Sequence, residues 1–390
     1  MLDTKYFCDL CGSETRYIYD PINTKRGMKL FICKKCGCLQ SLSFKNYPSR
    51  PEGNMSSDAD RASYKYTKTL ALGQYSTLLN KFCLNINTSN ILDIGMNRGA
   101  FYKWATRNFI YEKFTGIETD ASLTDEYCND KKVNLIIDRV ENVDLGSQIF
   151  DFAFCVHTLE HVKSANSVLR QVFRALKHGG VFFLAVPNII FHDDIVEEYF
   201  IDTHTFHFQY DILLNFIKNT GFRVKYCSEP FDSEIIFILE KKHKNYLKND
   251  KIKMNERYDK VLMELRKYED KIHINRELIS SSVTQINKYC LEKRKCFIWG
   301  AGRIFDCLIK FGRLKPNDYL FLIDKYLSDI ISNSNGFKIY KPKDLVQNID
   351  ENSIVYIASR RYRNEIQNEA KKLGIRKAIY FGSDGSLKDI

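Results

Sequence analysis

Hydrophobic and polar positions divide the 390-residue chain into two long stretches of alternating strand and helix patterns. Short apolar runs alternate with segments in which apolar residues recur every three to four positions, the period of a helix that packs on one face. The first stretch fills residues 61–240, and the second starts at residue 294. Such alternation is typical of α/β folds. We therefore expect an α/β protein with two Rossmann-like sheets.

The remaining segments have a different character. Residues 1–45 contain five of the twelve cysteines and little continuous apolar sequence, so they cannot build a core alone. Residues 46–60 are rich in Pro, Ser, Gly and Asp, which predicts a linker. Residues 241–293 alternate charged and apolar side chains at helical spacing, which predicts a long amphipathic helix or a helix pair. The expected organisation is thus a metal module (1–45), a central domain (61–240), a helical connector (241–293) and a C-terminal domain (294–390).

The first strand and turn of the central domain indicate a ligand. Residues 90–102 read NILDIGMNRGAFY, an apolar strand that enters a turn with Gly95 and Gly99 before a helix pattern. The next strand ends at Glu118, and an acid at this position of an open sheet can bind ribose hydroxyls. A dinucleotide fingerprint requires G-x-G-x-x-G, whereas this turn reads D-x-G-x-x-x-G. The turn therefore favours an adenosyl cofactor over a dinucleotide.

The turn resembles the first motif of class I S-adenosylmethionine-dependent methyltransferases. Residues 149–161 resemble their fourth strand and the turn after it, 168–187 their next helix, LKHGG turn and fifth strand, and 193–224 their closing helix and hairpin. The resemblance covers residues 88–240, and an unrelated nucleotide-binding α/β domain is the alternative. It implies that Glu118 binds both ribose hydroxyls, that Asp93 holds the loop or the amino group, and that residues 138–140 border adenine. The implied cofactor-binding set is Asp93, Gly95, Asn97, Gly99, Glu118, Asp138, Arg139 and Val140.

Histidines gather on the acceptor half of this domain, since six of the eight lie between positions 157 and 207. Methyl transfer depends mainly on alignment, and a general base helps when the acceptor is a hydroxyl or an acidic C–H group. We expect His204 to be this base, with Asp202 orienting it. His157, after the fourth strand, would contact the methionine moiety or the acceptor, or else cap a turn. His207 is a packed or surface residue in this interpretation.

The cysteine spacing predicts a metal site. Two C-x-x-C pairs, separated by 21 residues and each followed by a glycine, are typical of a zinc ribbon. Four thiolates leave no open coordination position, so the zinc would be structural. Cys38 is a fifth thiol outside the pairing. A redox dithiol and an iron–sulfur cluster are the alternatives. The expected ligands are Cys8, Cys11, Cys33 and Cys36.

The C-terminal domain repeats the glycine turn in weaker form. Residues 299–303 contain G-x-G, but Phe305 stands where the third glycine of a dinucleotide fingerprint would be, and Asp324 ends the next strand. A nucleotide-binding reductase is therefore an alternative, and a pure scaffold is another. A zinc module, a methyltransferase domain and a Rossmann-like tail together resemble the sugar C-methyltransferase family, which acts on nucleotide-linked deoxysugars. That resemblance implies that the tail helps to hold a nucleotide-sugar.

One departure from that family concerns the acceptor loop. The family typically carries a Glu-His pair where this chain has Thr203-His204, so both O-methylation and C-methylation stay open. The loop is equally similar to that of methyltransferases linked to glycan synthesis. We therefore expect a small-molecule acceptor, a sugar nucleotide or a glycan precursor.

Charge adds a second hypothesis about the partner. The formal net charge is +11, and residues 241–295 contain sixteen Lys and Arg residues against eight Asp and Glu residues. Such a surplus suits nucleic acid, an anionic surface or phosphorylated small substrates, or is simply a solvated helix face. A zinc-ribbon methyltransferase that binds RNA is the alternative function. No apolar run approaches the length of a membrane helix, and no secretory pattern is present, so we expect a cytoplasmic protein.

Overall fold

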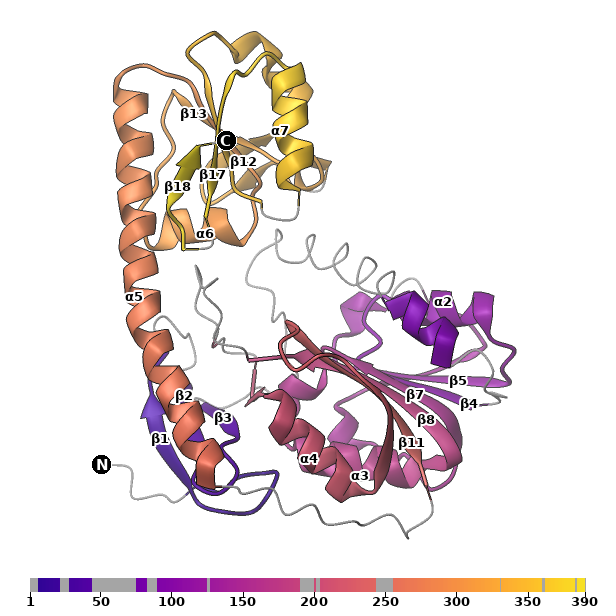
Figure 1. Cartoon of the computed structure of the whole chain (residues 1–390). Coiled ribbons are helices and arrows are strands. Elements are labelled where there is room, and N and C mark those ends of the chain that lie inside the picture. Colours follow the sequence, from indigo (N-terminus) through magenta and orange to yellow (C-terminus); the bar gives the residue numbers. More distant parts are fainter. Residues whose placement is uncertain are drawn as a thin grey trace. The chain divides into compact units, whose positions relative to one another are not determined.

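The computed structural model describes residues 6–21, 28–43, 75–82, 90–124, 127–189, 200, 204–242, 255–329, 331–359, 362–382 and 384–389. These residues form two compact units, of which the first ends at Met263 and the second runs from Glu264. Figure 1 labels their elements. The predicted linker 46–60 lies outside the described residues. Among the described helices, none is both long and apolar enough to cross a membrane.

The first unit is built on a seven-stranded sheet with the order β10-β11-β8-β7-β4-β5-β6. The strands from β8 to β6 run parallel, whereas β10 and β11 pair antiparallel and extend one side of the sheet. Strand β4 begins with a half-buried residue and then buries four consecutive side chains, as a strand covered on both faces does. The strands are β4 Asn90–Ile94, β5 Lys113–Glu118, β6 Val133–Ile137, β7 Phe150–Val156, β8 Leu176–Pro187, β10 Phe222–Cys227 and β11 Glu234–Lys241.

Helices cover both faces of this sheet (Figure 1). Helices α3 (Ala165–Ala175) and α4 (Tyr210–Thr220) pack on one face, and α2 (Ala100–Asn108) packs on the other together with the helical residues 75–82. Helix α3 begins at Ser164, whose side chain accepts a hydrogen bond from the backbone of Ser167 and so caps the helix. The sheet is therefore buried between layers, and only its strand ends are available to bind a ligand.

The LKHGG segment corrects one expectation. The sequence suggests a turn that separates helix and strand, but β8 already begins at Leu176, directly after α3. Leu176 pairs with Phe150, and Val181 pairs with Phe152, so β8 carries extra residues opposite its neighbour. Gly179 takes up this bulge with a φ of 78°, a conformation that glycine adopts without strain. The segment is therefore a bulge inside a strand.

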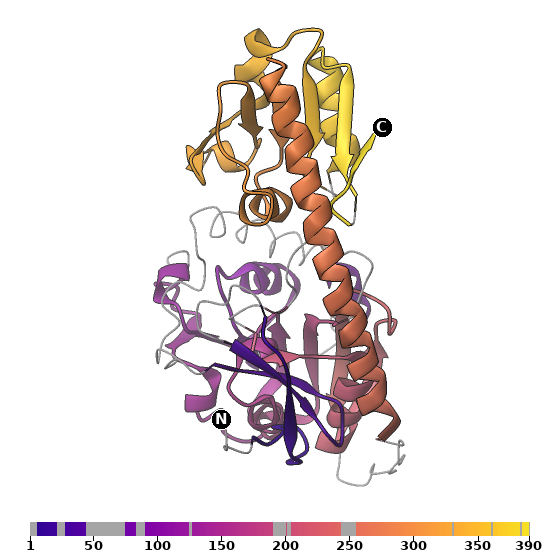
Figure 2. The ribbon, with the colours of Figure 1, turned by 90° about the vertical axis from the view of Figure 1, so that its left-hand side faces the viewer.

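The N-terminal cysteine segment forms a small antiparallel sheet with the order β1-β2-β3-β9, of which the first three strands are coloured indigo in Figure 2. Its last strand comes from a distant part of the sequence, because β9 (Phe206–His207) pairs with β3. Asp9 also accepts hydrogen bonds from Ser164 Oγ at 2.6 Å and from the Asn166 backbone at 2.8 Å. The cysteine segment thus shares one core with the large sheet. Its own strands are β1 Thr15–Tyr19, β2 Met28–Cys33 and β3 Leu39–Ser43.

The second unit contains another seven-stranded sheet, with the order β14-β15-β13-β12-β16-β17-β18. The inner strands are parallel, and the edge strands β14 and β18 are antiparallel to their neighbours. Between residues 255 and 291 the structure has one helix rather than a pair, α5, which is uninterrupted in both views (Figures 1 and 2). The elements are α5 Asn255–Leu291, β12 Cys296–Trp299, α6 Arg303–Lys310, β13 Leu320–Ile323, β14 Asn333–Ser334, β15 Phe337–Tyr340, β16 Ile354–Ile357, α7 Arg363–Lys372, β17 Lys377–Phe381 and β18 Leu387–Asp389.

Candidate active site and metal centre

The glycine turn after β4 lies at the carboxyl edge of the parallel strands. Gly95 has a φ of 76°, and its N–H donates to Ile117 O at 2.9 Å, which ties the turn to the neighbouring strand. A Cβ atom at Gly95 would lie 2.0 Å from Thr158 Oγ1, and one at Gly99 would lie 2.7 Å from the Tyr127 ring. Glycine is therefore required at both positions by conformation and by space.

Glu118, at the end of β5, is buried, and its carboxylate binds the same turn. Its Oε2 accepts from Asn97 N at 2.7 Å, and its Oε1 accepts from Thr119 N at 2.8 Å and from Asp120 N at 3.1 Å. A carboxylate offers about four acceptor sites. The remaining site, on Oε2, can accept one ribose hydroxyl. A second hydroxyl would have to replace one of these backbone bonds.

The other predicted cofactor residues surround this turn in different ways. Asp93 is buried in β4, at 2% exposure. Asp138 Oδ1 accepts from Arg139 N at 2.7 Å and from Asn142 Nδ2 at 2.9 Å, so this carboxylate stabilises the turn after β6. Arg139 donates to His161 O at 3.1 Å. Val140 is buried in the core. The structure therefore gives Asp138 and Val140 structural contacts, in addition to any role beside adenine.

These residues fit an adenosyl cofactor. The turn has no side chain at Gly95 and Gly99, the two positions that would pass nearest to the cofactor. Glu118 keeps one acceptor site for a hydroxyl. Asn97 holds the turn in place, since its side chain accepts from Arg98 N at 2.9 Å and its own N–H binds Glu118. Backbone at Gly95 and Gly99 would pass the methionine portion of the cofactor, and Glu118 would bind its ribose.

A polar cluster, which we call the His157 cluster, lies directly beside this turn. It consists of Tyr75, His157, Glu160 and Glu234, and Thr158 links it to Gly95. His157 Nε2 is 2.6 Å from Glu234 Oε1, and its Nδ1 is 3.6 Å from Glu160 Oε1. Tyr75 OH donates to Glu234 Oε2 at 2.7 Å. His157 itself has a φ of 48°, an uncommon value for a residue with a side chain.

The two carboxylates determine the charge of His157. Burial alone would lower its pKa, but hydrogen bonds to Glu160 and Glu234 raise the pKa to about 9. Burial would raise the pKa of Glu160, but the hydrogen bond from His157 and the nearby histidines lower it to about 2. Hydrogen bonds that favour the charged forms outweigh desolvation here. His157 is therefore an imidazolium at neutral pH, which suits a hydrogen-bond donor better than a general base.

A second group, which we call the Glu160 triad, consists of Glu160, His161 and His204. Their potential ligand atoms all lie within 4.8 Å of one another. The rings of His161 and His204 meet edge to face with centroids 4.8 Å apart. Asp202, the expected partner of His204, lies outside the described residues. The structure thus brings His204 to the turn after β7, near the cofactor loop.

His207 is packed rather than exposed. It is 2% exposed, and its Nε2 lies 2.6 Å from Ser41 Oγ in the N-terminal sheet. Burial lowers the pKa of His207 well below its usual value. The His207 side chain therefore joins β9 to β3, and Ser41 N also donates to Thr205 O at 2.8 Å. This pairing fixes the backbone on both sides of Phe206, directly after His204.

Comparison with known families supports the central assignment. Residues 66–225 match the family model of a methyltransferase domain. These residues are an S-adenosylmethionine-dependent methyltransferase domain. The class I fold expected from the sequence is confirmed. Residues 292–379 match a second model, described as the N-terminal domain of C2185-like proteins. No curated protein matched the chain.

Solved structures of methyltransferases align with this methyltransferase over less than half of its length. One from Mesorhizobium loti is 16% identical, covers 43% of this chain and 97% of its own, and has a TM-score of 0.37. One from Methanosarcina mazei is 19% identical, with coverages of 43% and 98% and a TM-score of 0.35. One from Archaeoglobus fulgidus is 16% identical, with coverages of 42% and 92% and a TM-score of 0.35. With TM-scores below 0.5, they support no inference about the present chain.

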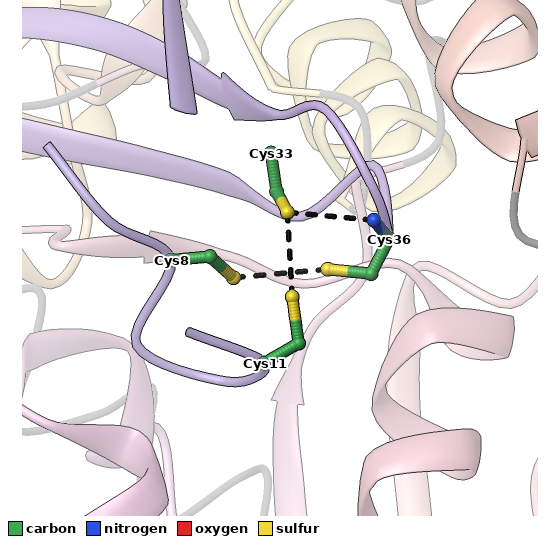
Figure 3. Close-up of side chains that lie close together, drawn as sticks. All are labelled: Cys8, Cys11, Cys33 and Cys36. Atoms are coloured by element: carbon green, nitrogen blue, oxygen red, sulfur yellow. Dashed lines mark hydrogen bonds between the residues drawn. The ribbon is translucent and has the colours of Figure 1, made fainter. Parts of the chain in front are cut away.

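The four predicted cysteine ligands of the methyltransferase converge on one point (Figure 3). Cys8 Sγ and Cys36 Sγ are 3.7 Å apart, and Cys11 Sγ and Cys33 Sγ are 3.4 Å apart. Backbone N–H groups of Lys35 and Cys36 point at Cys33 Sγ, each at 3.4 Å. This closed set of four soft ligands fits tetrahedral zinc.

The two cysteine turns have the same backbone pattern. Gly12 N donates to Cys8 O at 2.8 Å, and Gly37 N donates to Cys33 O at 3.0 Å. Both glycines have positive φ, 71° and 76°. In the second turn Cys38 supplies a backbone acceptor to Cys33 N, and its thiol lies near Leu39 O. Cys38 is therefore outside the sulfur cluster, as the spacing suggests.

The second glycine turn of the methyltransferase also ends in an acid that is held by the backbone. Asp324 accepts from Ala301 N at 3.0 Å, Tyr326 N at 3.0 Å and Leu327 N at 2.9 Å. A Cβ atom at Gly300 would lie 2.9 Å from Ala358 O, whereas one at Gly302 would meet nothing within 4 Å. Asp324 therefore stabilises its own loop with three backbone hydrogen bonds, the same number that Glu118 accepts.

Sequence reasoning missed several members of the site. Glu160 and His161 stand in the H-T-L-E-H motif, where the three-residue spacing from His157 was an available signal. Glu234 and Tyr75 have no such signal. Glu234 starts the antiparallel strand β11, opposite Pro187, and reaches His157 only through the order of the strands. Contacts of this kind depend on the assembled sheet.

Proposed function

We propose that this methyltransferase transfers a methyl group to a sugar nucleotide or glycan precursor, at an oxygen or an activated carbon. The main support is the polar character of the sheet edge beside the cofactor turn. Tyr75, His157, Glu160, His161, His204 and Glu234 place six hydrogen-bonding side chains there. Fixed donors and acceptors of this density suit a polyhydroxylated acceptor, because an apolar acceptor would offer them no additional hydrogen bonds.

The expected roles of the residues follow from their positions. When bound, S-adenosylmethionine supplies a methyl group on a sulfonium with an excellent leaving group. Gly95 and Gly99 leave room for it, and Glu118 holds its ribose. The His157 imidazolium donates a hydrogen bond toward the reacting edge, and Glu234 and Glu160 orient it. His204 serves the removal of the acceptor proton, which contributes about 10²–10⁴-fold to such reactions.

We further propose that Cys8, Cys11, Cys33 and Cys36 bind one structural zinc. The supporting observation is the closed sulfur cluster with two matching turns. Metal analysis of the purified chain should give about one zinc. Cys33→Ser should lower that content sharply, whereas Cys38→Ser should leave it unchanged. An iron-rich, coloured protein, or zinc content that Cys33→Ser leaves intact, would exclude this assignment.

A direct assay tests the substrate class. The full chain is incubated with methyl-labelled S-adenosylmethionine and either a panel of nucleotide-sugars or total RNA, and label transfer is counted. We expect label transfer to a nucleotide-sugar or glycan precursor, and we expect His204→Ala to abolish this transfer. Transfer to RNA with no sugar product would replace this proposal with the RNA-binding alternative, for which the +11 charge is the favouring observation.

A further inference from the structure

The Glu160 triad is a group of potential metal ligands, and cofactor binding does not require any of them. Glu160 and His161 end the short 3-10 turn Leu159–His161, and His204 reaches them from a distant segment. His161 Nε2 and Glu160 Oε1 are 3.8 Å apart. Two imidazoles and one carboxylate therefore converge within a volume that a single ion can occupy.

Glu160 is the residue that points to a cation. Its side chain is only 2% exposed, and burial makes a carboxylate charge costly unless it is compensated. His157 and His161 lie on the side of Oε1. Oε2 is buried and has no hydrogen-bond partner among the described residues. The Glu160 carboxylate therefore keeps acceptor capacity that the described residues do not use and that a metal ion can use.

The backbone holds the three ligands in place before any ion binds. Thr205 N donates to Glu160 O at 2.8 Å, which joins the His204 segment to the Glu160 turn. Ser41 N donates to Thr205 O on the other side, and Arg139 donates to His161 O. Metal–ligand bonds of about 2.1 Å require ligand atoms about 3 Å apart. Side-chain rotations that bring the ligand atoms from spacings of up to 4.8 Å to about 3 Å would therefore close the site.

We propose that Glu160, His161 and His204 bind a divalent first-row cation, distinct from the zinc of the cysteine cluster. Two histidines and one carboxylate on one side of an ion are a donor set for such metals and leave coordination positions open. His161 keeps 35% of its side chain exposed, so those positions face an accessible edge. The closed sulfur cluster offers no such position.

The open positions take the oxygen of the acceptor, and this part of the inference rests on the proposed function. An ion lowers the pKa of a bound hydroxyl. The acceptor O–H bond then breaks with its proton passing to water, and the new O–C bond forms as the C–S bond to the methyl group breaks. His204 serves proton removal as a ligand here, rather than as a free base.

Manganese is a suitable probe, because it prefers nitrogen and oxygen ligands and leaves thiolate-bound zinc in place. The zinc-loaded full chain is titrated with Mn²⁺ and followed by electron paramagnetic resonance and calorimetry. We expect one Mn²⁺ per chain, and the strongest broadening for the His161 and His204 ring signals in NMR spectra of the unmodified protein. Zn²⁺ beyond the first equivalent should compete with it.

Variants locate the ion. Glu160→Gln and His204→Ala should each weaken Mn²⁺ binding about 10-fold or more, whereas His273→Ala, an exposed histidine of α5, should not. Cys33→Ser should lose zinc but keep Mn²⁺. The absence of Mn²⁺ and second-equivalent Zn²⁺ binding, or binding that both ligand variants leave unchanged, would overturn the inference.

The outcomes separate the two proposals. If Mn²⁺ binds at the triad but no sugar acceptor is methylated, the cation site stands and the proposed substrate class fails. If a sugar acceptor is methylated at full rate after chelation and no cation binds, the cation site fails. His204 would then be the general base that the sequence predicts.

Discussion

The chain contains two sheets that end in a glycine turn and an acid, yet their carboxyl edges differ in chemistry. Glu118 accepts from the backbone of its glycine turn through Asn97, and Asp324 does the same through Ala301. Both acids also bind the first N–H groups after their own strand. Up to this point the two turns follow one structural rule, in which a carboxylate connects a turn to the next strand.

The difference lies in what surrounds each turn. Beside Gly95, Thr158 leads into the His157 cluster and the Glu160 triad. Beside Gly300, the nearest atoms are backbone atoms of Ala358. The residues of the second edge make packing and loop contacts. The shared layout therefore describes the fold, and the titratable side chains at one edge determine the function.

The largest expected effect comes from adding a side chain to the first glycine turn. Gly95→Ala would force a side chain to a φ of 76° and to 2.0 Å from Thr158 Oγ1. Strain of this kind costs about 1–3 kcal/mol, and with the added overlap S-adenosylmethionine affinity should fall about 100-fold or more. Equilibrium binding of labelled cofactor measures it.

Gly302→Ala is the matched control in the second turn. Its Cβ meets nothing within 4 Å, and its φ is −94°, so cofactor affinity should not change. Equal losses of cofactor affinity in the two variants would mean that both sheet edges take part in cofactor binding. The proposed difference between the two edges would then be wrong.

The next effect concerns turnover. His204→Ala should lower turnover by about 10²-fold while cofactor affinity stays within a factor of about three, because the residue serves the acceptor rather than the cofactor. Initial rates at saturating cofactor measure it, and His273→Ala is the control. Near-normal turnover of His204→Ala would leave His157, or alignment alone, as the source of the chemistry.

A smaller effect is expected on stability. Glu234→Gln removes the carboxylate that pairs with His157 and accepts from Tyr75, so the free energy of unfolding of the first unit should fall by about 1–3 kcal/mol. Trp104 lies in the first unit and Trp299 in the second. Trp104 fluorescence in a Trp299→Phe background therefore reports on the first unit during urea unfolding.

The second unit provides the control. Asp329→Asn breaks the exposed pair with Lys341, in which the side chains are 60% and 38% exposed, and should change stability by less than about 1 kcal/mol. If Glu234→Gln changed the free energy of unfolding as little as Asp329→Asn does, the His157 cluster would contribute no more to stability than an exposed ion pair.

The features that the sequence predicts correctly depend on short-range patterns. Gly95 and Gly99 were predicted because a turn between strand and helix shows in the local sequence, and the four cysteines because two identical knuckles need two identical spacings. Those features require only residues that are close together along the chain.

The parts that sequence reasoning missed depend on strand order and pairing. Glu234 reaches His157 because β11 lies beside β8, and His204 reaches Glu160 because β9 pairs with β3. Asp324 ends its strand where a ribose-binding acid would stand, and its carboxylate accepts from three backbone N–H groups, as that of Glu118 does. No local pattern distinguishes an acid that binds ligand from one that binds its own loop.

The comparison is tested most directly by calorimetric titration of the full chain with S-adenosylmethionine, using Glu118→Ala and Asp324→Ala side by side. The two acids have matching backbone roles, so folding defects should be similar, and circular dichroism can check them. We predict that Glu118→Ala weakens binding about 10-fold, as expected for the loss of a hydrogen bond to a charged group of about 1.5–3 kcal/mol, whereas Asp324→Ala leaves the affinity unchanged. Binding that depends on Asp324 and not on Glu118 would contradict the placement of the active site on the first sheet.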